Sequence, residues 1–270
     1  MPEASGEAGV TAALGPLREE PSRAAVLTDI DGTLAPIVTD PGEAGISDEA
    51  RELLAALASR YAVVGCVSGR RAAEARDLVG VEAIAYAGNH GLELLLPGES
   101  EVRLDPALEG RENQAAEYLA RLDGDAIGAF GLRLEDKGPI QALHWRGVED
   151  ESAAEARARE IAAEAGRAGL DARWGRKVLE LRPTGGGGKD AAVAALLTGA
   201  EVESAVYAGD DRTDLDAFRR LRELAEGGDL RRAVCVGVVS DEGPAEIAAE
   251  ADLTAEGPEG WVAMLRQLAG

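Results

Sequence analysis

The stretch Thr28-Asp29-Ile30-Asp31-Gly32-Thr33-Leu34 decides the fold of this chain. It follows an apolar run at 24–27, which predicts a short buried strand that ends in two carboxylates and a turn glycine. Side chains two residues apart on an extended strand point the same way, so we expect Asp29 and Asp31 to share one small volume. In open parallel sheets, that carboxyl edge is where ligands bind. An isolated D-x-D-G is better interpreted as a pair of exposed turn aspartates, and only the rest of the chain favours a site.

Strands and helices alternate on both sides of this stretch. We expect further core strands at 61–67, 83–87, 205–209, 233–239 and 251–254, and helices at 47–59, 72–79, 190–197, 214–225, 244–249 and 259–268. This alternation predicts an α/β fold with a doubly wound parallel sheet. Residues 1–22 predict a loose tail with a short docking helix around 10–18.

The middle of the chain has a different pattern. Strands at 92–96 and 101–104, joined by Pro97-Gly98, predict a hairpin, and further strands are expected at 131–135, 140–146 and 177–182 with helices at 111–121 and 150–167. Strands paired by hairpins, together with two helices, predict a small α+β domain inserted into the larger one. We therefore expect a tail over 1–22, a core over 23–105 and 184–270, and an inserted domain over 106–183.

Composition limits the function classes. A chain of 270 residues with a net charge of −22 lacks the basic surface that nucleic-acid binding requires, so we expect no nucleic-acid partner. No run approaches the length of a membrane span, and the acidic start lacks the basic region of a signal peptide. Cys66 and Cys235 lie in apolar runs and are interpreted as buried structural thiols. We expect a cytoplasmic protein, monomeric or weakly oligomeric, without membrane contact.

Four groups of polar residues lie at or after the predicted core strands: Asp29 with Asp31, the segment 68–70, Lys189, and the segment 209–214. Each has a simpler explanation. Ser68 alone is a good helix cap, and Lys189 follows a glycine run that does not complete a phosphate-loop motif. Acids at a helix start are favourable against the helix dipole, which explains one or two of Asp210, Asp211 and Asp214 but not all three.

Together the four groups make chemical sense. A carboxylate that attacks a phosphate monoester meets anion–anion repulsion, which a divalent ion and a lysine can neutralise. Asp29 and Asp210 offer the oxygen donors that Mg²⁺ accepts. Ser68, with Arg70, can hold phosphoryl oxygens. Asp31 can give a proton to a departing alcohol and later take one from water.

The motifs D-I-D-G-T, S-G-R, the isolated Lys189 and G-D-D-R-T-D, in that order, resemble the haloacid dehalogenase superfamily, and the insertion resembles its larger α+β cap. The segments Y-A-G-N-H-G-L-E at 86–93, E-D-K-G at 135–138, L-H-W-R at 143–146 and K-V-L-E-L-R-P at 177–183 resemble trehalose-6-phosphate phosphatases. The resemblance covers the chain from about Ala24 to its end.

The resemblance implies a Mg²⁺-dependent hydrolysis of trehalose 6-phosphate to trehalose and phosphate through an aspartyl-phosphate. It makes Asp29 the nucleophile and Asp31 the general acid/base. The implied metal ligands are the Asp29 side chain, the Asp31 main-chain oxygen and Asp210, with Asp211 or Asp214 supporting. The expected phosphate-binding residues are Ser68, Gly69, Arg70 and the catalytic Lys189, and the expected substrate-binding residues are Asn89, His90, Glu135, Lys137, His144, Glu180 and Arg182.

Two departures bear on the sugar. The family often has Ser at the position of Asn89 and Tyr at the position of Trp145, so sucrose phosphate and a mannosylglycerate phosphate stay open as alternative substrates. A phospho-accepting signalling domain also clusters aspartates, Ser or Thr and Lys on a parallel sheet. Such a domain has no use for Asp31 or for a cap.

The cap strands alternate in character without reference to the family. Leu179 and Leu181 oppose Glu180 and Arg182, and the strands at 131–135 and 140–146 alternate in the same way. One face is therefore apolar and covered by the two cap helices, whereas the other is charged. A charged face is commonly solvated in antiparallel sheets, but hydrogen bonds to many hydroxyls are what discriminate a sugar phosphate from a smaller ester. We expect the three tryptophans to lie in cores rather than to stack on sugar.

Overall fold

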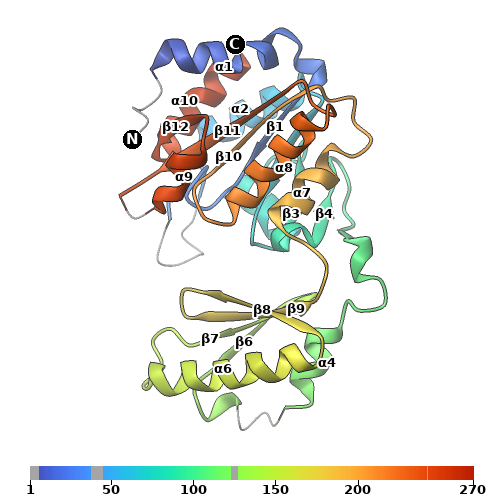
Figure 1. Ribbon diagram of the computed structural model, residues 1–270, viewed down its shortest axis with the longest axis vertical. Coiled ribbons are helices and arrows are strands. Elements are labelled where there is room, and N and C mark those ends of the chain that lie inside the picture. The colour runs from blue at the N-terminus through green and yellow to red at the C-terminus, as the bar shows by residue number, and fades with distance from the viewer. Residues whose placement is uncertain (1–5, 38–44, 123–126, 242) are drawn as a thin grey trace. The chain divides into compact units, whose positions relative to one another are not determined.

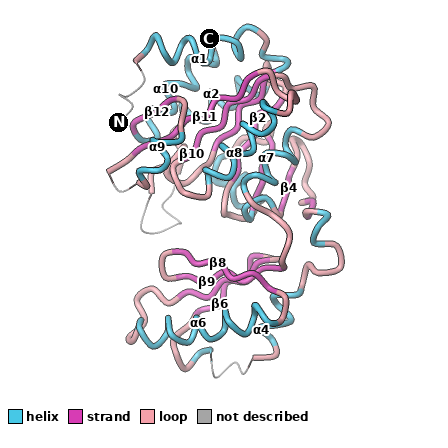
Figure 2. The backbone as a smooth tube through the Cα atoms, in the orientation of Figure 1, coloured by secondary structure: helices cyan, strands magenta, loops and turns pink. Residues whose placement is uncertain are grey.

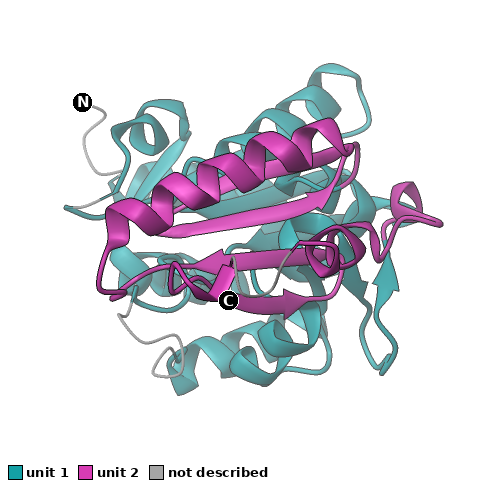
Figure 3. Cartoon of the chain, turned by 90° about the horizontal axis from the view of Figure 1, so that it is seen from below, with its two compact units in different colours: residues 1–104, 187–270 teal, residues 105–186 magenta. Residues whose placement is uncertain are grey.

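The computed structural model describes the chain except for residues 1–5, 38–44, 123–126 and 242. The chain divides into two compact units, residues 1–104 with 187–270 and residues 105–186, which Figure 3 shows in different colours. The chain leaves the first unit once and returns to it once. One unit is therefore an insertion into the other.

The first unit is built on an eight-stranded sheet with the order β12-β11-β10-β1-β2-β3-β4-β5 (Figure 1). Its strands are β1 (Ala24–Thr28), β2 (Val63–Val67), β3 (Ala85–Gly88), β4 (Glu93–Leu95), β5 (Arg103–Leu104), β10 (Ser204–Gly209), β11 (Arg232–Val239) and β12 (Leu253–Glu256). The strands from β12 to β3 pair in parallel, and the predicted hairpin β4–β5 extends the same sheet in antiparallel fashion. The prediction of a doubly wound α/β fold is confirmed.

Helices cover both faces of this sheet. The apolar cluster on one face includes residues of α1 (Glu7–Glu19), α2 (Asp48–Ala58), α3 (Ala72–Val79) and α10 (Gly257–Ala269). The cluster on the other face includes residues of α7 (Lys189–Leu197), α8 (Asp214–Glu226) and α9 (Ala245–Glu250). All five residues of β1 are buried, as expected for a parallel strand with helices on both sides.

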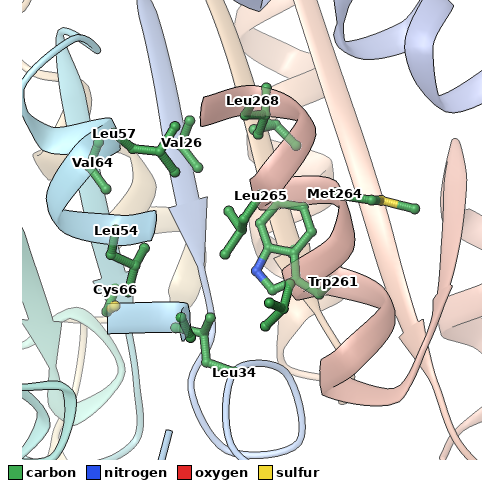
Figure 4. Close-up of a cluster of buried hydrophobic side chains, with 14 of the residues drawn as sticks. Val26, Leu34, Leu54, Leu57, Val64, Cys66, Trp261, Met264, Leu265 and Leu268 are labelled. Carbon is green, nitrogen blue, oxygen red and sulfur yellow. The ribbon is translucent and has the colours of Figure 1, made fainter. Parts of the chain in front are cut away.

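Figure 4 shows how one face packs around β1. Val26 of β1 lies between Leu57 of α2 and Leu265 of α10. The Trp261 indole is fully buried in this layer, and its Nε1 donates a hydrogen bond to the Thr28 hydroxyl at 3.0 Å. This bond satisfies the one polar atom of the indole and fixes α10 against the end of β1.

Helix α1 is longer than the short docking helix expected within a loose tail. It spans 7–19, and Val10, Leu14 and Leu17 are buried in the first unit. The spacing of these residues, four and then three, gives one apolar stripe on a helix. The stripe anchors the segment, so the segment is part of the packed core.

The second unit is an antiparallel sheet covered on one face by helices (Figure 2). Its strands, in the order β6-β7-β9-β8, are Arg133–Lys137, Ile140–His144, Val178–Pro183 and Leu170–Gly175, and its helices include α4 (Gln114–Ala120) and α6 (Glu151–Arg167). Strand β8 was not predicted, although its apolar residues at 170, 172 and 174 alternate with charged residues at 171 and 173, which is the period of a strand. Ala158 and Ile161 of α6 pack in one cluster with Leu143 and Leu179 of the sheet, as expected of the apolar face. Leu134, expected on the same face, is 54% exposed because it lies on the edge strand β6.

The tryptophans and cysteines test the expected cores. Trp145 and Trp261 are buried as expected, but Trp174 is 45% exposed, because it lies on the unpredicted edge strand β8. Both cysteines are free and buried, as predicted. None of the helices in the described part of the chain has the length and apolar character that a membrane crossing requires.

Candidate active site

Three strand ends bring the predicted polar groups to one edge of the core sheet. Strand β1 pairs on one side with β10 and on the other with β2, so that Thr28 lies opposite Ala208 and Cys66. Asp29, Asp210 and Ser68 therefore follow three adjacent parallel strands at their carboxyl ends. From these ends the chain runs from β1 to β2 on one side and from β10 to β11 on the other, and such a switch point is where α/β sheets bind ligands.

Lys189 connects two of the buried carboxylates. It is the first residue of α7, and its Nζ lies 2.7 Å from Asp29 Oδ1 and 2.6 Å from Asp214 Oδ1. The side chains of Lys189, Asp29 and Asp214 are only 4%, 7% and 0% exposed. The predicted convergence of these distant residues is therefore seen in the structure.

The cluster holds more negative than positive charge. Burial raises the pKa of Asp29 well above its usual range, even though Lys189 acts in the opposite direction. Burial and the neighbouring Asp214 raise the pKa of Asp210 to about 7. Burial alone would lower the pKa of Lys189, but Asp214 and Asp29 raise it above its usual value, so the lysine stays charged. One lysine does not balance three acids.

The donor set fits a divalent cation. Asp29, Asp210 and Asp214 each offer a carboxylate oxygen, and these three atoms lie within 4.8 Å of one another. Carboxylate oxygens are hard donors of the kind that Mg²⁺ and similar ions prefer. Gly32 lets the backbone after β1 come close to the Asp210 carboxylate, because its φ is +89° and a Cβ there would lie 2.0 Å from Asp210 Oδ2.

Asp214 differs from the other two acids in its hydrogen bonds. Its Oδ1 accepts from Lys189 and from the Tyr207 hydroxyl at 2.6 Å. Its Oδ2 accepts from the backbone N–H groups of Asp210 at 3.2 Å and Asp211 at 3.0 Å. This pattern suits a residue that orders the lysine and the 209–214 turn and supports the ligands.

Two members of the cluster were missed in the sequence. Thr33 is fully buried, and its hydroxyl lies 3.2 Å from Asp210 Oδ1 and 3.5 Å from Asp29 Oδ2. Thr33 belongs to the D-I-D-G-T motif, so its conspicuous position was available as a signal. Tyr207 lies inside an apolar strand, and no sequence signal distinguishes it from a core residue.

Asp31 does not join the Asp29 cluster as the strand argument expected. Strand β1 ends at Thr28, and the chain turns at Ile30, whose carbonyl accepts hydrogen bonds from the N–H groups of residues 33–35. The carboxylate of Asp31 instead forms two hydrogen bonds with Arg70, at 2.8 Å from Nε and 2.6 Å from Nη2. Asp29 and Asp31 follow the end of β1, so they lie in this turn, and both carboxylates act on the Arg70 guanidinium, whose pKa they raise.

The segment Ser68–Arg70 is held by the loop that follows β3. The His90 N–H donates to the Ser68 carbonyl at 3.0 Å, and the Asn89 N–H donates to the Arg70 carbonyl at 2.7 Å. The His90 ring lies on Gly69, where a Cβ would come within 2.8 Å of Nε2. The Asn89 side chain, expected to contact substrate, is fully buried and donates to Glu93 at 2.9 Å.

The remaining predicted residues lie in the second unit. Lys137 Nζ is 2.8 Å from Glu180 Oε1, and His144 Nε2 is 2.7 Å from Glu135 Oε2. Arg182 is also on this sheet and is 4% exposed. The strand register places Glu135 and Glu180 on either side of Ala142, so both carboxylates share the face opposite the helices.

A family model described as trehalose-phosphatase matches residues 27–254. The chain belongs to this family. The family implies a metal cofactor and a small-molecule substrate, and the acidic cluster of Asp29, Asp210 and Asp214 fits the former. The resemblance inferred from the motifs is thereby confirmed.

Two relatives of this trehalose-phosphatase family member illustrate the likeness. Probable trehalose-phosphate phosphatase 3 of Oryza sativa subsp. japonica is 30% identical over 242 residues, which cover 83% of this chain and 64% of the relative. Trehalose-phosphate phosphatase of Mycolicibacterium paratuberculosis is 36% identical over 238 residues, which cover 83% of this chain and 57% of the relative. The chain thus spans somewhat less than two thirds of the length of these relatives.

Among solved structures, the C-terminal domain of trehalose-6-phosphate phosphatase from C. albicans resembles this chain with a TM-score of 0.75 at 22% identity. The likeness covers 97% of this chain and 96% of that domain. It shows the shared fold, which is of the expected haloacid dehalogenase-like type.

Proposed function

We propose that this chain is a Mg²⁺-dependent phosphatase that hydrolyses trehalose 6-phosphate to trehalose and phosphate through an aspartyl-phosphate on Asp29. The observation that carries the proposal is the buried cluster in which Lys189 contacts both Asp29 and Asp214 beside Asp210. The printed names of the relatives support the substrate.

In the first step, an Asp29 oxygen forms a bond to phosphorus while the bond from phosphorus to the sugar oxygen breaks. Lys189 favours the ionised form of Asp29 against the effect of burial and orients its carboxylate for this attack. Ser68 and Arg70, with the Gly69 N–H, hold the phosphoryl oxygens. Mg²⁺, bound by Asp29 and Asp210 with the Asp31 main-chain oxygen and Asp214 or Asp211 supporting, would supply the positive charge that offsets repulsion between carboxylate and phosphate.

Asp31 handles the protons. It gives a proton to the departing sugar oxygen in the first step, because an alkoxide is a poor leaving group. In the second step it takes a proton from the water that attacks phosphorus and breaks the bond to Asp29. Asp31 must therefore enter the first step as the protonated acid, and the two hydrogen bonds from Arg70 fit its ionised form, which takes the proton from water in the second step.

We assign sugar recognition to the charged face of the second unit. Glu135, Lys137, His144, Glu180 and Arg182 offer both hydrogen-bond donors and acceptors, which hydroxyl groups require. Asn89 and His90 remain proposed contributors from the first unit. We also propose that the protein works in the cytoplasm, where two free buried thiols are stable, as a monomer or weak oligomer.

The test is phosphate release from a substrate panel with and without Mg²⁺. We expect kcat/KM for trehalose 6-phosphate to exceed that for sucrose phosphate and a mannosylglycerate phosphate by at least about tenfold, the scale of the net free energy of one hydrogen bond. A higher kcat/KM for either of the other two phosphates would change the proposed substrate and leave the proposed mechanism in place. Turnover that needs no divalent ion would overturn the proposed mechanism.

A further inference from the structure

Glu93 is a buried carboxylate that the proposed reaction does not use. It begins β4, and its side chain is 3% exposed. We propose that Glu93 is a positioning residue that holds the loop Ser68–Arg70 in the conformation that binds phosphate. The inference rests on the proposed function, because that function assigns the loop to the phosphoryl oxygens.

The first tie runs from Glu93 to the end of the loop. Its Oε2 accepts a hydrogen bond from the backbone N–H of Ala72 at 2.8 Å. Helix α3 begins at Ala72, and the preceding residue, Arg71, provides no side-chain cap. The first N–H groups of a helix need acceptors from outside the helix. Glu93 supplies one from another strand and so fixes the chain two residues after Arg70.

The second tie runs through Asn89. Glu93 Oε1 accepts from Asn89 Nδ2 at 2.9 Å, and the Asn89 N–H donates to the Arg70 carbonyl at 2.7 Å. The next residue, His90, donates its N–H to the Ser68 carbonyl. Glu93 is therefore linked by hydrogen bonds to both sides of Gly69.

The loops that Glu93 joins are strained and closely packed. Asn89 and His90 have φ values of 50° and 54°, in the left-handed region that L residues rarely adopt. A Cβ at Gly88 would lie 2.1 Å from the Ala72 nitrogen, so the two loops touch backbone to backbone. Such an arrangement persists only where neighbouring contacts hold it. A shift of about 1 Å at Ser68 is enough to lower activity about a hundredfold.

The direction in which phosphate affinity changes when Glu93 is replaced distinguishes a positioning role from an electrostatic one. A carboxylate close to a phosphate loop repels phosphate, and Arg71, with its Nε 3.7 Å from Glu93 Oε1, offsets this only in part. If charge dominated, removing the carboxylate would strengthen phosphate binding. Positioning predicts the opposite, weaker binding.

The experiment compares Glu93→Ala and Glu93→Gln with Ser47→Ala as a matched control. Ser47 accepts from the Ala50 N–H at 3.1 Å and caps α2 in the same unit, so Ser47→Ala removes a helix cap away from the phosphate loop. For each protein, titration calorimetry in the presence of Mg²⁺ would give the affinity for inorganic phosphate. Steady-state assays would give kcat and KM for para-nitrophenyl phosphate. Circular dichroism sets a temperature at which each variant is folded.

We expect Glu93→Ala to weaken phosphate binding and to lower kcat/KM by at least about tenfold, by the same factor on para-nitrophenyl phosphate and trehalose 6-phosphate. Glu93→Gln keeps an acceptor for the Ala72 N–H, so its decreases in phosphate affinity and in kcat/KM should be smaller than those of Glu93→Ala. Ser47→Ala should lower the melting temperature and leave phosphate affinity unchanged.

Unchanged or tighter phosphate binding in folded Glu93→Ala would overturn the inference. If that variant does not fold, wild-type phosphate affinity in Glu93→Gln would overturn it equally. A wild-type protein that hydrolyses para-nitrophenyl phosphate but not trehalose 6-phosphate would remove the proposed substrate and leave the Glu93 comparison valid. A wild-type protein that binds no inorganic phosphate and hydrolyses no phosphomonoester in Mg²⁺ would end both proposals.

Discussion

Each unit contains a lysine in contact with carboxylates, and the two sites differ in burial and charge balance. In the first unit, the side chains of Lys189, Asp29 and Asp214 are 4%, 7% and 0% exposed. In the second, the side chains of Lys137 and Glu180 are 11% and 15% exposed, and Lys137 Nζ lies 2.8 Å from Glu180 Oε1. Buried acids in excess of cations are unfavourable until more positive charge arrives. We infer that the first site is built for chemistry with a bound ion and the second for recognition.

The largest effect should come from removing the proposed nucleophile of the first site. Asp29→Asn should abolish turnover on every phosphomonoester, with a loss of about 10³-fold or more, because no covalent intermediate can form. Phosphate release measures the loss, and circular dichroism shows that the fold is kept. A rate near that of the wild type would refute the assignment.

The next effect belongs to Asp31, which contacts Arg70 rather than the buried cluster. Asp31→Asn should slow both phosphoryl transfer and hydrolysis by roughly 10²- to 10⁴-fold, the range of general acid–base catalysis. The first step should suffer less with para-nitrophenyl phosphate, whose leaving group needs no proton. Rapid-quench kinetics separate the two steps. A variant that changes substrate affinity alone would assign Asp31 to binding.

A smaller and selective effect should follow from the second site. Glu180→Ala removes a charged hydrogen-bond acceptor, and a hydrogen bond to a charged group contributes about 1.5 to 3 kcal/mol. We therefore expect kcat/KM for trehalose 6-phosphate to fall about 10- to 100-fold. The rate with para-nitrophenyl phosphate, which has no sugar, should change less than about threefold. The matched control is Glu155→Ala, which breaks an exposed ion pair with Arg159 on α6. Equal losses on both substrates would mean that the charged face is merely solvated.

The smallest expected effect is a dependence of folding stability on pH, which should come from the first site and not from the second. The pKa of Asp210 in the folded protein is raised from its usual 3.8 to about 7 by burial and Asp214. Between about pH 4 and pH 7 the folded metal-free state therefore binds more protons than the unfolded chain. The contribution of this group to stability falls as pH rises through that window.

Mg²⁺ should counteract this loss. It competes with protons, so the rise in melting temperature on adding Mg²⁺ should be larger at about pH 8 than at about pH 5. At a Mg²⁺ concentration 100 times Kd the gain is about 2.7 kcal/mol. Differential scanning calorimetry of the wild type and Asp210→Asn is the measurement. The variant should lose the stabilisation by Mg²⁺ and part of the pH dependence, because the pKa of Asp29 is raised as well. A melting temperature indifferent to Mg²⁺ would contradict the metal site.

The sequence predicted the elements whose signal is local. Strand β1 and the acids after it, the β4–β5 hairpin and the alternation of β9 could all be read from periodicity and turn residues. Strand β8 was missed, although its apolar residues at 170, 172 and 174 alternate with charged residues at 171 and 173. Trp174 lies on this edge strand and is 45% exposed, whereas a core position was expected.

The sequence identified most residues of the candidate site but fewer of the contacts between them. Lys189 and Asp29 were identified from their places after core strands, and the structure brings them to 2.7 Å. The Asp31 pairing with Arg70 could not be predicted, because the bend at Ile30 is a property of the turn and not of residue spacing. Tyr207 and Glu93 act through tertiary hydrogen bonds that leave no local pattern.

The central claim is that Asp29 carries the phosphoryl group during turnover. Asp31→Asn slows hydrolysis of the intermediate, and para-nitrophenyl phosphate needs no proton for the first step, so the intermediate should accumulate when the two are mixed with Mg²⁺. The mixture can then be quenched in acid, reduced with borohydride and digested for mass spectrometry. The account predicts a modified peptide that contains residue 29, formed only with Mg²⁺ and absent from Asp29→Asn. Turnover without a modification at residue 29, or a phosphoryl group on another side chain, would contradict it.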